Sequence, residues 1–462
     1  MPGALDGFRI IDVTQMVSGP MATMMLADQG ADVIKIEPPG TGDLTRALAG
    51  RRRGMSPPFA VINRNKRSVV IDLKSERGRT DSEALIASAQ AVLHNFPPER
   101  ALAFGLDRER VRSVNPRAVW CAVSALGSDG PDAQLNAFDL IAQALSGLLL
   151  ADLRGGDTVP RRAGGIAMAD FTAGLLAAIA VLGGLFAAEH ERGSAPGLGG
   201  QAGGLGDPAA GPGPAAHDAE GSAHDTEGSG HDAEGSAPGI EVSLLGAALA
   251  VQAQRFVSVE PLDAAARARR LAQPRPRTAA DLAARAAQTA DLEALEPYYR
   301  AYRAADGFFA LACLNERQRR SVLGVLGVLA CEDPFVANPQ AAPRDERERQ
   351  RRLAHVRRVE DAFAQRGVEE CVAALRVARV PAAPVRALDE LFDDPQATRN
   401  GLVTSVSVDG VGEVRQLGSL FKVNGTVAHG SRPAPKLGEH TDEILTECRA
   451  GACTDQRAAV SA

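Results

Sequence analysis

A single carboxylate, Asp170, stands in the small and apolar stretch RRAGGIAMADFTAG at residues 161–174, directly before a strongly apolar segment. Carboxylates can act as nucleophiles that form covalent intermediates, which makes Asp170 a candidate catalytic residue. Its position also suits a helix N-cap, because Asp is a preferred capping residue and an apolar helix is expected to follow. Position alone favours the cap, and one aspartate could serve both purposes.

Three histidines recur in a second stretch with possible chemistry, the repeat HDAEGSA, HDTEGSG, HDAEGSA at residues 217–237, which contains His217, His224 and His231. The repeat lies within residues 197–239, which hold seven acidic residues but no basic and no aromatic residue. Such a composition cannot bury enough apolar surface to fold. We therefore expect an acidic, low-complexity, disordered insertion rather than a metal site, and we predict no metal elsewhere.

The overall composition limits the class of protein. The 462 residues are 45% apolar and 4% aromatic, which is typical of a globular protein with about two domains. The net charge of -6 argues against a nucleic-acid partner, because phosphate binding needs a surplus of basic residues on one face. The basic run at 344–358 is mixed in sign, as solvated helix faces often are.

Cysteine usage and hydropathy indicate the compartment. The sequence contains no CxxC pair, and the six cysteines are scattered: Cys121, Cys313, Cys331, Cys371, Cys448 and Cys453. This pattern predicts neither a disulfide framework nor a zinc site, and it favours a reducing, cytoplasmic compartment. The apolar run at 171–190 is rich in Gly and Ala and ends in charge, so we expect a buried helix and no membrane contact.

Strand-like and helix-like segments alternate over the first 126 residues, which predicts a Rossmann-like α/β domain with a parallel sheet. The expected strands are 8–14, 31–37, 67–73, 91–96 and 118–126, and the first expected helix is 19–30. The turn after the first strand reads QMVSGP, so the GxGxxG fingerprint of dinucleotide-binding domains is missing. A nicotinamide-dependent oxidoreductase is therefore disfavoured.

The second half of the chain predicts further short elements. A strand is expected to run into a helix at 240–256, and a hairpin at 298–314 is expected to turn at the tripeptide ADG. An amphipathic helix is expected at 359–377. Short strands at 402–408 and 414–423 precede an expected terminal helix.

Several long motifs in order along the chain resemble those of the class III CoA-transferase family, which includes formyl-CoA and carnitinyl-CoA transferases and α-methylacyl-CoA racemases. The motifs are DVTQMVSGPMATMMLADQGADVIKIEPPGTGD at 12–43, NRNKRSVVIDLKSERGR at 63–79, HNFPP at 94–98, IEVSLL at 240–245, PVRALDELFDDPQATRNGL at 384–402 and LGEHTDEIL at 437–445. The resemblance implies a Rossmann-like large domain built from both chain ends, a smaller α/β domain and an interlocked homodimer. The implied boundaries are a large CoA-binding domain at 1–196, the insertion at 197–239, a small domain at 240–385 and a C-terminal return at 386–462.

The resemblance also implies that Asp170 is the nucleophile, because GGIAMADFTAG matches the family segment that carries the catalytic aspartate. The expected reaction moves CoA between an acyl-CoA thioester and a free carboxylic acid through an aspartyl-CoA thioester. Small neighbours of Asp170 would admit a bulky thioester, and nearby backbone N–H groups could stabilise an oxyanion. CoA is then a co-substrate, and no tightly bound cofactor is expected.

Matching positions imply the CoA contacts. They cluster at the predicted carboxyl ends of strands, where open α/β sheets bind ligands: Val17, Ser18, Ile71, Asp72, Leu73, Lys74, Asn95, Phe96 and Asp139. Ile71 and Phe96 would also be core residues in any such sheet. Pro38 and Ala103 stand where many members have arginines for the CoA phosphates, and one of the arginines at 51–53 could substitute.

Two alternatives remain open beside the transferase. Racemases of the family use a histidine directly before an aspartate, whereas this chain has Phe138 before Asp139, and phenylalanine cannot carry a proton. A non-catalytic CoA-binding relative would keep the fold and lose the reaction. The acyl donor and the acceptor acid are not defined by the sequence, and succinyl-CoA with a small dicarboxylate is suggested only by the commonest family chemistry.

Overall fold

The structure is a computed structural model. It describes residues 3–48, 50, 53–135, 137–194, 237–259, 262–272, 276–293, 295–329, 333–335, 343–423, 425–427 and 432–460. Most of the insertion expected at 197–239, including the three repeat histidines, therefore lies outside the described residues. Its last residue, Gly239, already belongs to a strand.

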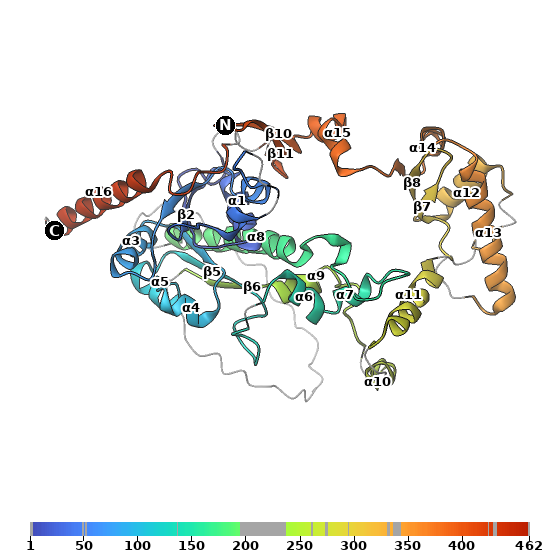
Figure 1. Ribbon diagram of the computed structural model, residues 1–462, viewed down its shortest axis with the longest axis horizontal. Coiled ribbons are helices and arrows are strands. Elements are labelled where there is room, and N and C mark those ends of the chain that lie inside the picture. The colour runs from blue at the N-terminus through green and yellow to red at the C-terminus, as the bar shows by residue number, and fades with distance from the viewer. Residues whose placement is uncertain are drawn as a thin grey trace, which may run out of the picture.

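A six-stranded parallel sheet forms the centre of the larger part of the molecule (Figure 1). Its strands are β1 (Arg9–Asp12), β2 (Asp32–Glu37), β3 (Arg67–Val70), β4 (Ala91–His94), β5 (Val119–Ser124) and β6 (Gly239–Ser243). The order is β3-β2-β1-β4-β5-β6, which is the order found in doubly wound nucleotide-binding sheets. Every strand predicted in the first 126 residues is present, somewhat shorter than predicted.

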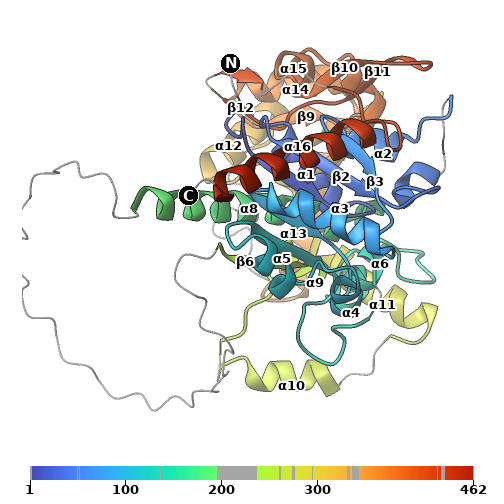
Figure 2. The same cartoon turned by 90° about the vertical axis from the view of Figure 1, so that its left-hand side faces the viewer.

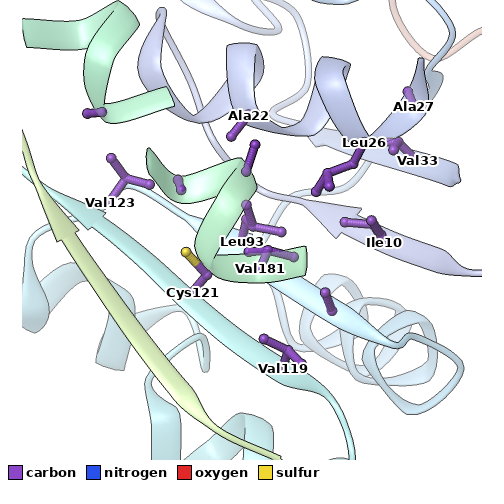
Figure 3. Close-up of a cluster of buried hydrophobic side chains, with 14 of the residues drawn as sticks. Ile10, Ala22, Leu26, Ala27, Val33, Leu93, Val119, Cys121, Val123 and Val181 are labelled. Carbon is purple, nitrogen blue, oxygen red and sulfur yellow. The ribbon is translucent and has the colours of Figure 1, made fainter. Parts of the chain in front are cut away.

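Helices cover both faces of this sheet. Adjacent residues of a strand point to opposite faces, so neighbouring apolar residues pack in different cores. Ile10 packs in one core with residues of α1 (Ser18–Ala27), α8 (Met168–Ser194) and α9 (Leu244–Ala250), as Figure 3 shows in part. Its neighbour Ile11 packs in a second core with residues of α3 (Glu76–Ala87), α4 (Pro98–Ala103), α5 (Arg108–Val114) and α16 (Thr441–Val460). Figure 2 shows α16 crossing the same side of the sheet as α3.

Helix α8 is only partly the buried helix expected at 171–190. One face is buried and carries mostly alanines, among them Ala173 and Ala177. The opposite face leaves large apolar side chains in solvent, with Ile179 65% and Phe186 75% exposed. The helix is long and apolar enough to cross a membrane by length and composition alone, but its buried face belongs to the core of the sheet domain.

A smaller antiparallel sheet, β7 (Tyr299–Arg303), β8 (Phe308–Ala312) and β9 (Ala382–Pro384), packs with three helices and stands apart from the large sheet (Figure 1). The predicted hairpin is confirmed: β7 pairs with β8, and the amide of Ala304 donates to the carbonyl of Gly307. The helices are α12 (Glu316–Leu326), α13 (Glu346–Ala364) and α14 (Val368–Val377). The prediction of a single helix at 359–377 is wrong. Helix α13 ends at Ala364, and Gly367 takes an extended conformation before α14 begins.

The remaining elements flank or connect these two parts. They are α2 (Pro57–Ile62), α6 (Asp139–Leu145), α7 (Leu148–Ala151), α10 (Ala264–Ala272), α11 (Ala279–Glu293), α15 (Pro395–Arg399), the hairpins β10 (Val403–Val408) with β11 (Gly412–Leu417) and β12 (Lys422–Val423) with β13 (Thr426–Val427), and the 3-10 helices η1 (Leu44–Ala47), η2 (Ala163–Gly165) and η4 (Leu388–Phe392). The strand predicted at 414–423 is interrupted after Leu417.

The boundary predicted at residue 240 needs correction. Strand β6 pairs in parallel with β5, with Trp120 opposite Gly239, so β6 and the following α9 belong to the large sheet and not to the smaller part. At the other end of the chain, Ile444 of α16 lies in the core of the large sheet. Residues from both ends of the chain therefore build the larger part.

Candidate active site

A small cavity of about 80 Å³ lies where the carboxyl ends of β4 and β5 meet the first turns of α1 and α8. Most of the residues that line it are apolar, and Asp170 is the only ionisable side chain among the described lining residues: Met16, Ser18, Asn95, Phe96, Pro97, Val123, Ser124, Ala125, Ala133, Leu135, Ala137, Phe138, Asp170 and Leu244. The structure thus brings together Ser18, Asn95, Phe96 and Asp170 from the predicted set.

Asp170 lies inside the first turn of α8, which begins at Met168, so it is not the N-cap that its position suggested. Another carboxylate fulfils that function. Oδ1 of Asp139, at the start of α6, accepts hydrogen bonds from the amides of Ala169 at 2.9 Å and Asp170 at 3.4 Å. Such bonds satisfy amides that a helix N-terminus otherwise leaves unpaired.

Asp139 is itself held from two sides. Its Oδ2 accepts a hydrogen bond from Nε2 of Gln143, one turn later on α6, at 2.8 Å, and lies 3.5 Å from Nε of Arg162. The side-chain oxygen of Gln143 accepts from the amide of Ala163 at 2.9 Å. The loop that precedes Asp170 is therefore fixed to α6 through polar contacts.

The surroundings of Asp170 raise the pKa of its carboxyl to about 7. Burial is the largest cause, and the nearby negative charge of Asp139 acts in the same direction. The charge of Arg162 and a hydrogen bond with the Ser18 side chain act in the opposite direction. A carboxylate with a raised pKa is more basic, which favours its use as a nucleophile or proton acceptor near neutral pH.

Close packing of α1 against α8 places Ser18 beside Asp170. A Cβ on Gly174 would lie 2.8 Å from the carbonyl oxygen of Ser18 and 2.9 Å from Cβ of Met21. Only a glycine allows the two helices this approach.

The turn before α1 rests on buried ion pairs. Nζ of Lys35 lies 2.9 Å from Oδ2 of Asp43 and donates a hydrogen bond to the carbonyl oxygen of Thr14 at 2.8 Å. Asp43 in turn accepts from the amide of Met16, which adopts a positive φ of 69°. Nζ of Lys66 lies 2.9 Å from Asp12, and burial lowers the pKa of Lys66 to about 8. This charged cluster fixes the backbone that presents Met16 and Ser18 to the cavity.

The predicted CoA contacts besides Ser18 and Asp139 fall into three groups: the residues that shape the turn before α1, the core residue Phe96 and the segment 71–74. Both ends of the Asn95 amide are bonded to the backbone of Gln15, so Asn95 clamps the turn, and Val17 stands at the N-cap position of α1. Phe96 is 8% exposed and packs against Phe104, so it is also a core residue.

The third group, residues 71–74, follows β3 and does not line the cavity. Ile71 and Leu73 are buried in the core, whereas Asp72 and Lys74 are exposed at the same edge of the sheet. Contact of these residues with CoA stays a prediction.

Sequence reasoning missed the contributions of Met16, Gln143 and Arg162. Arg162 lies eight residues before Asp170 in the sequence, so its closeness to Asp170 could have been predicted. The contact of Gln143 with the amide of Ala163 arises only when α6 meets the loop before α8. Phe138, in the position of the racemase histidine, lines the cavity and is 52% exposed. Of the arginines suggested as substitutes for CoA-phosphate contacts, residues 51 and 52 lie outside the described residues and Arg53 lines a different cavity.

Comparison with known proteins identifies the family of this chain. The model of the family described as CoA-transferase family III matches residues 5–197 and 229–441, which leaves 198–228 of the expected insertion unmatched. The chain therefore belongs to CoA-transferase family III, and it is an enzyme of the CoA-transferase class.

Individual relatives agree with this family. The chain is 27% identical to a succinate–glutarate CoA-transferase of Agrobacterium fabrum over 96% of this chain and 95% of the relative. It is 36% identical to an acetyl-CoA:oxalate CoA-transferase of Acetobacter aceti over 40% of this chain and 48% of the relative. A CaiB/BaiF family protein from Brucella suis has a similar fold, with a TM-score of 0.66, 23% identity and coverage of 97% of this chain and 100% of that chain.

Proposed function

We propose that this CoA-transferase exchanges CoA between an acyl-CoA and a free carboxylic acid through a covalent aspartyl-CoA thioester on Asp170. The observation that carries the proposal is the isolation of this carboxylate. Asp170 is the only ionisable side chain among the described residues of the cavity, and burial raises its pKa to about 7. Covalent chemistry needs one such group, whereas a two-base racemase needs a second ionisable group on the opposite face of the carbon.

The proposed sequence conserves every atom. The Asp170 carboxylate attacks the thioester carbonyl and expels CoA thiolate, which leaves a mixed anhydride. The thiolate attacks the Asp170 carbonyl of the anhydride and releases the first acid as a carboxylate. The acceptor carboxylate then attacks the aspartyl-CoA thioester and expels CoA thiolate, which leaves a second mixed anhydride. The thiolate attacks the acceptor carbonyl of this anhydride, which forms the new acyl-CoA and restores the Asp170 carboxylate.

The hydrogen bond between Ser18 and Asp170 supports the positioning of the nucleophile. The capping bonds of Asp139 hold the first turn of α8, so the backbone that carries Asp170 is fixed before substrate arrives.

Mass spectrometry of the protein incubated with a panel of acyl-CoAs tests the mechanism. We expect a CoA thioester on the peptide that contains Asp170, its absence in Asp170→Asn, and its retention in Asp132→Asn, which changes an exposed acid. A missing adduct with every donor, together with CoA binding in calorimetry, would identify a relative that binds CoA without turnover.

The racemase alternative is disfavoured at this site. Phe138 lines the cavity beside Asp170, and a phenyl ring cannot accept a proton. Exchange of the α-proton of an acyl-CoA in heavy water, measured by NMR, would reveal such an activity if it existed.

The proposed substrates are succinyl-CoA as donor and a small dicarboxylate as acceptor. This choice rests on relatives named succinate–glutarate and succinyl-CoA:glutarate CoA-transferases, which align over 96% of this chain. Oxalate is the competing acceptor, because relatives named for it align with 40–41% of the chain at 36% identity. Direct rate comparison of glutarate and oxalate with succinyl-CoA decides between them.

A homodimer is proposed from the exposed face of α8. Phe171, Leu175, Ile179 and Phe186 lie on it with exposed fractions of 37–75%, and a second copy of the chain would remove them from water. Light scattering is expected to give a dimer, and Ile179→Lys is expected to weaken it. The interlocked arrangement and the Rossmann-like assignment of the large domain are part of this proposal.

A cytoplasmic location is likewise proposed. Four cysteines in the described part of the chain are buried and form no disulfide bond: Cys121, Cys313, Cys371 and Cys448. Free thiols of this kind are typical of a reducing compartment.

A further inference from the structure

A second cavity, of about 320 Å³ and thus larger than the one at Asp170, lies between α2, the hairpin β10–β11 and the segment 433–436. Figure 2 shows α2 and this hairpin on the same side of the molecule. The second cavity shares no lining residue with the cavity at Asp170. Its volume reaches the lower end of the range found for small-molecule sites.

The walls of this cavity are apolar on two sides. Val406 on β10 and Val414 on β11 are cross-strand partners, and they line the cavity together with Met55 and Phe59. The aromatic ring of Phe59 is covered on one face by the guanidinium of Arg46, 3.7 Å from the ring centroid. An aliphatic chain would be sheltered between these walls.

One polar group in the wall of the cavity, buried beneath its surface, is unpaired. Gln416 lies on the same strand face as Val414 and is 4% exposed, and its Nε2 has no hydrogen-bond partner among the described residues. A buried amide donor without a partner costs free energy, and a ligand oxygen would remove that cost. A neutral oxygen suits this depth, because a buried carboxylate would itself need a charged partner.

The rim carries the charge. Arg53 is exposed and donates a hydrogen bond to the carbonyl of Val411, while Lys436 lies 3.7 Å from the exposed Asp409. Arg46, deeper in the wall, is neutralised by Glu37 at 2.6 Å. The rim therefore retains an excess positive charge at the mouth, opposite the buried amide.

We propose that this cavity is a second binding site, distinct from the catalytic one, for a short-chain keto or hydroxy acid. The Gln416 amide turns toward the cavity and donates to the inner oxygen of the acid, the chain lies between Phe59 and the two valines, and the carboxylate meets Arg53 and Lys436 at the rim. The site does not depend on the proposed covalent mechanism.

Isothermal titration of the full chain with 4-oxopentanoate tests this site, with hexanoate as the probe that lacks the inner oxygen. We expect Gln416→Leu to weaken 4-oxopentanoate roughly three- to tenfold, the effect of one hydrogen bond, and to leave hexanoate unchanged. Arg53→Gln is expected to weaken both acids. Glu413→Gln, on the opposite face of β11, is the matched control and is expected to change neither.

Two results would overturn the proposal. One is no heat of binding for 4-oxopentanoate at millimolar concentration. The other is equal affinity in wild type, Gln416→Leu and Arg53→Gln, which would place the bound acid elsewhere, including the catalytic cavity. Arg53 is exposed, so its variant is expected to fold even if Gln416→Leu does not, and circular dichroism checks both.

Discussion

Oδ1 of Asp139 accepts a hydrogen bond from the amide of Asp170 at 3.4 Å, and the charge of the first carboxylate raises the pKa of the second. One residue thus fixes the start of α8 and tunes the group that the helix presents. The two effects arise from the same carboxylate, because an anion that caps a helix also repels a second anion in its first turn.

The pH dependence of turnover follows from this pair. The attacking form of Asp170 is the carboxylate, and its pKa is raised to about 7. The kcat/KM is therefore expected to rise with pH up to about 7 and then level off. In Asp139→Asn the repulsion is gone while a side-chain oxygen remains to cap α8, so the midpoint is expected to move to lower pH. A profile of kcat/KM from pH 5 to 9 in both proteins measures the shift; an unmoved midpoint would contradict the assigned coupling.

The free energy of unfolding should change with pH in the direction opposite to kcat/KM: it should fall as Asp170 loses its proton. Between the ordinary Asp pKa of 3.8 and the raised value near 7, the folded protein holds a proton that the unfolded chain has lost, so folding stability falls as pH rises through this window. Asp170→Asn removes this dependence and is expected to be more stable than wild type by up to about 4 kcal/mol above pH 7. Near pH 4 the two proteins should be alike.

Urea unfolding at pH 4, 6 and 8 measures this difference. Asp132→Asn, which changes an exposed acid, is the control and is expected to show no such pH-dependent gain. Equal pH dependence in wild type and Asp170→Asn would mean that burial does not perturb this carboxyl.

Two glycines of α8 test how the helix positions the site. Gly174→Ala places a Cβ 2.8 Å from the Ser18 carbonyl oxygen, so α1 must move, with an expected loss of roughly 1–3 kcal/mol and a lower kcat. Gly183 has open space around the same position, so Gly183→Ala is expected to stabilise the helix by about 0.5–1 kcal/mol. Thermal unfolding and initial rates of the two variants give the comparison. Equal effects would show that the close approach has no energetic consequence.

The sequence predicted the parts of this fold that local patterns determine. β-Branched runs bounded by Gly, Pro and polar residues marked the five N-terminal strands, and the stretch around Asp170 marked the site. It failed where long-range packing decides. The contact between Asp139 and Asp170 joins residues that only the meeting of α6 and α8 brings together. The residues on the exposed side of α8 are as apolar as those of a buried helix. The sequence alone therefore does not show that no other element covers this face in the described structure.

Lys35 illustrates the same limit. In ADVIKIE it has the pattern of a solvent-facing strand residue, yet its side chain is fully buried between Asp12 and Asp43. These partners come from β1 and from the loop after β2, so only sheet pairing and loop closure bring them to Lys35.

This burial gives the last prediction. Lys35→Met leaves Asp43 without its cation, and removing one partner of a buried ion pair costs about 3–5 kcal/mol. Because Nζ of Lys35 also holds the carbonyl of Thr14, the turn that carries Met16 and Ser18 should loosen, and kcat should fall. Lys35→Met combined with Asp43→Asn restores charge balance and is expected to recover part of the stability but not the Thr14 contact. Urea unfolding with initial rates separates the two effects, with exposed Lys74→Met as the stability control. Full recovery of both quantities in the double variant would show that charge balance alone, and not the bond to Thr14, positions the turn.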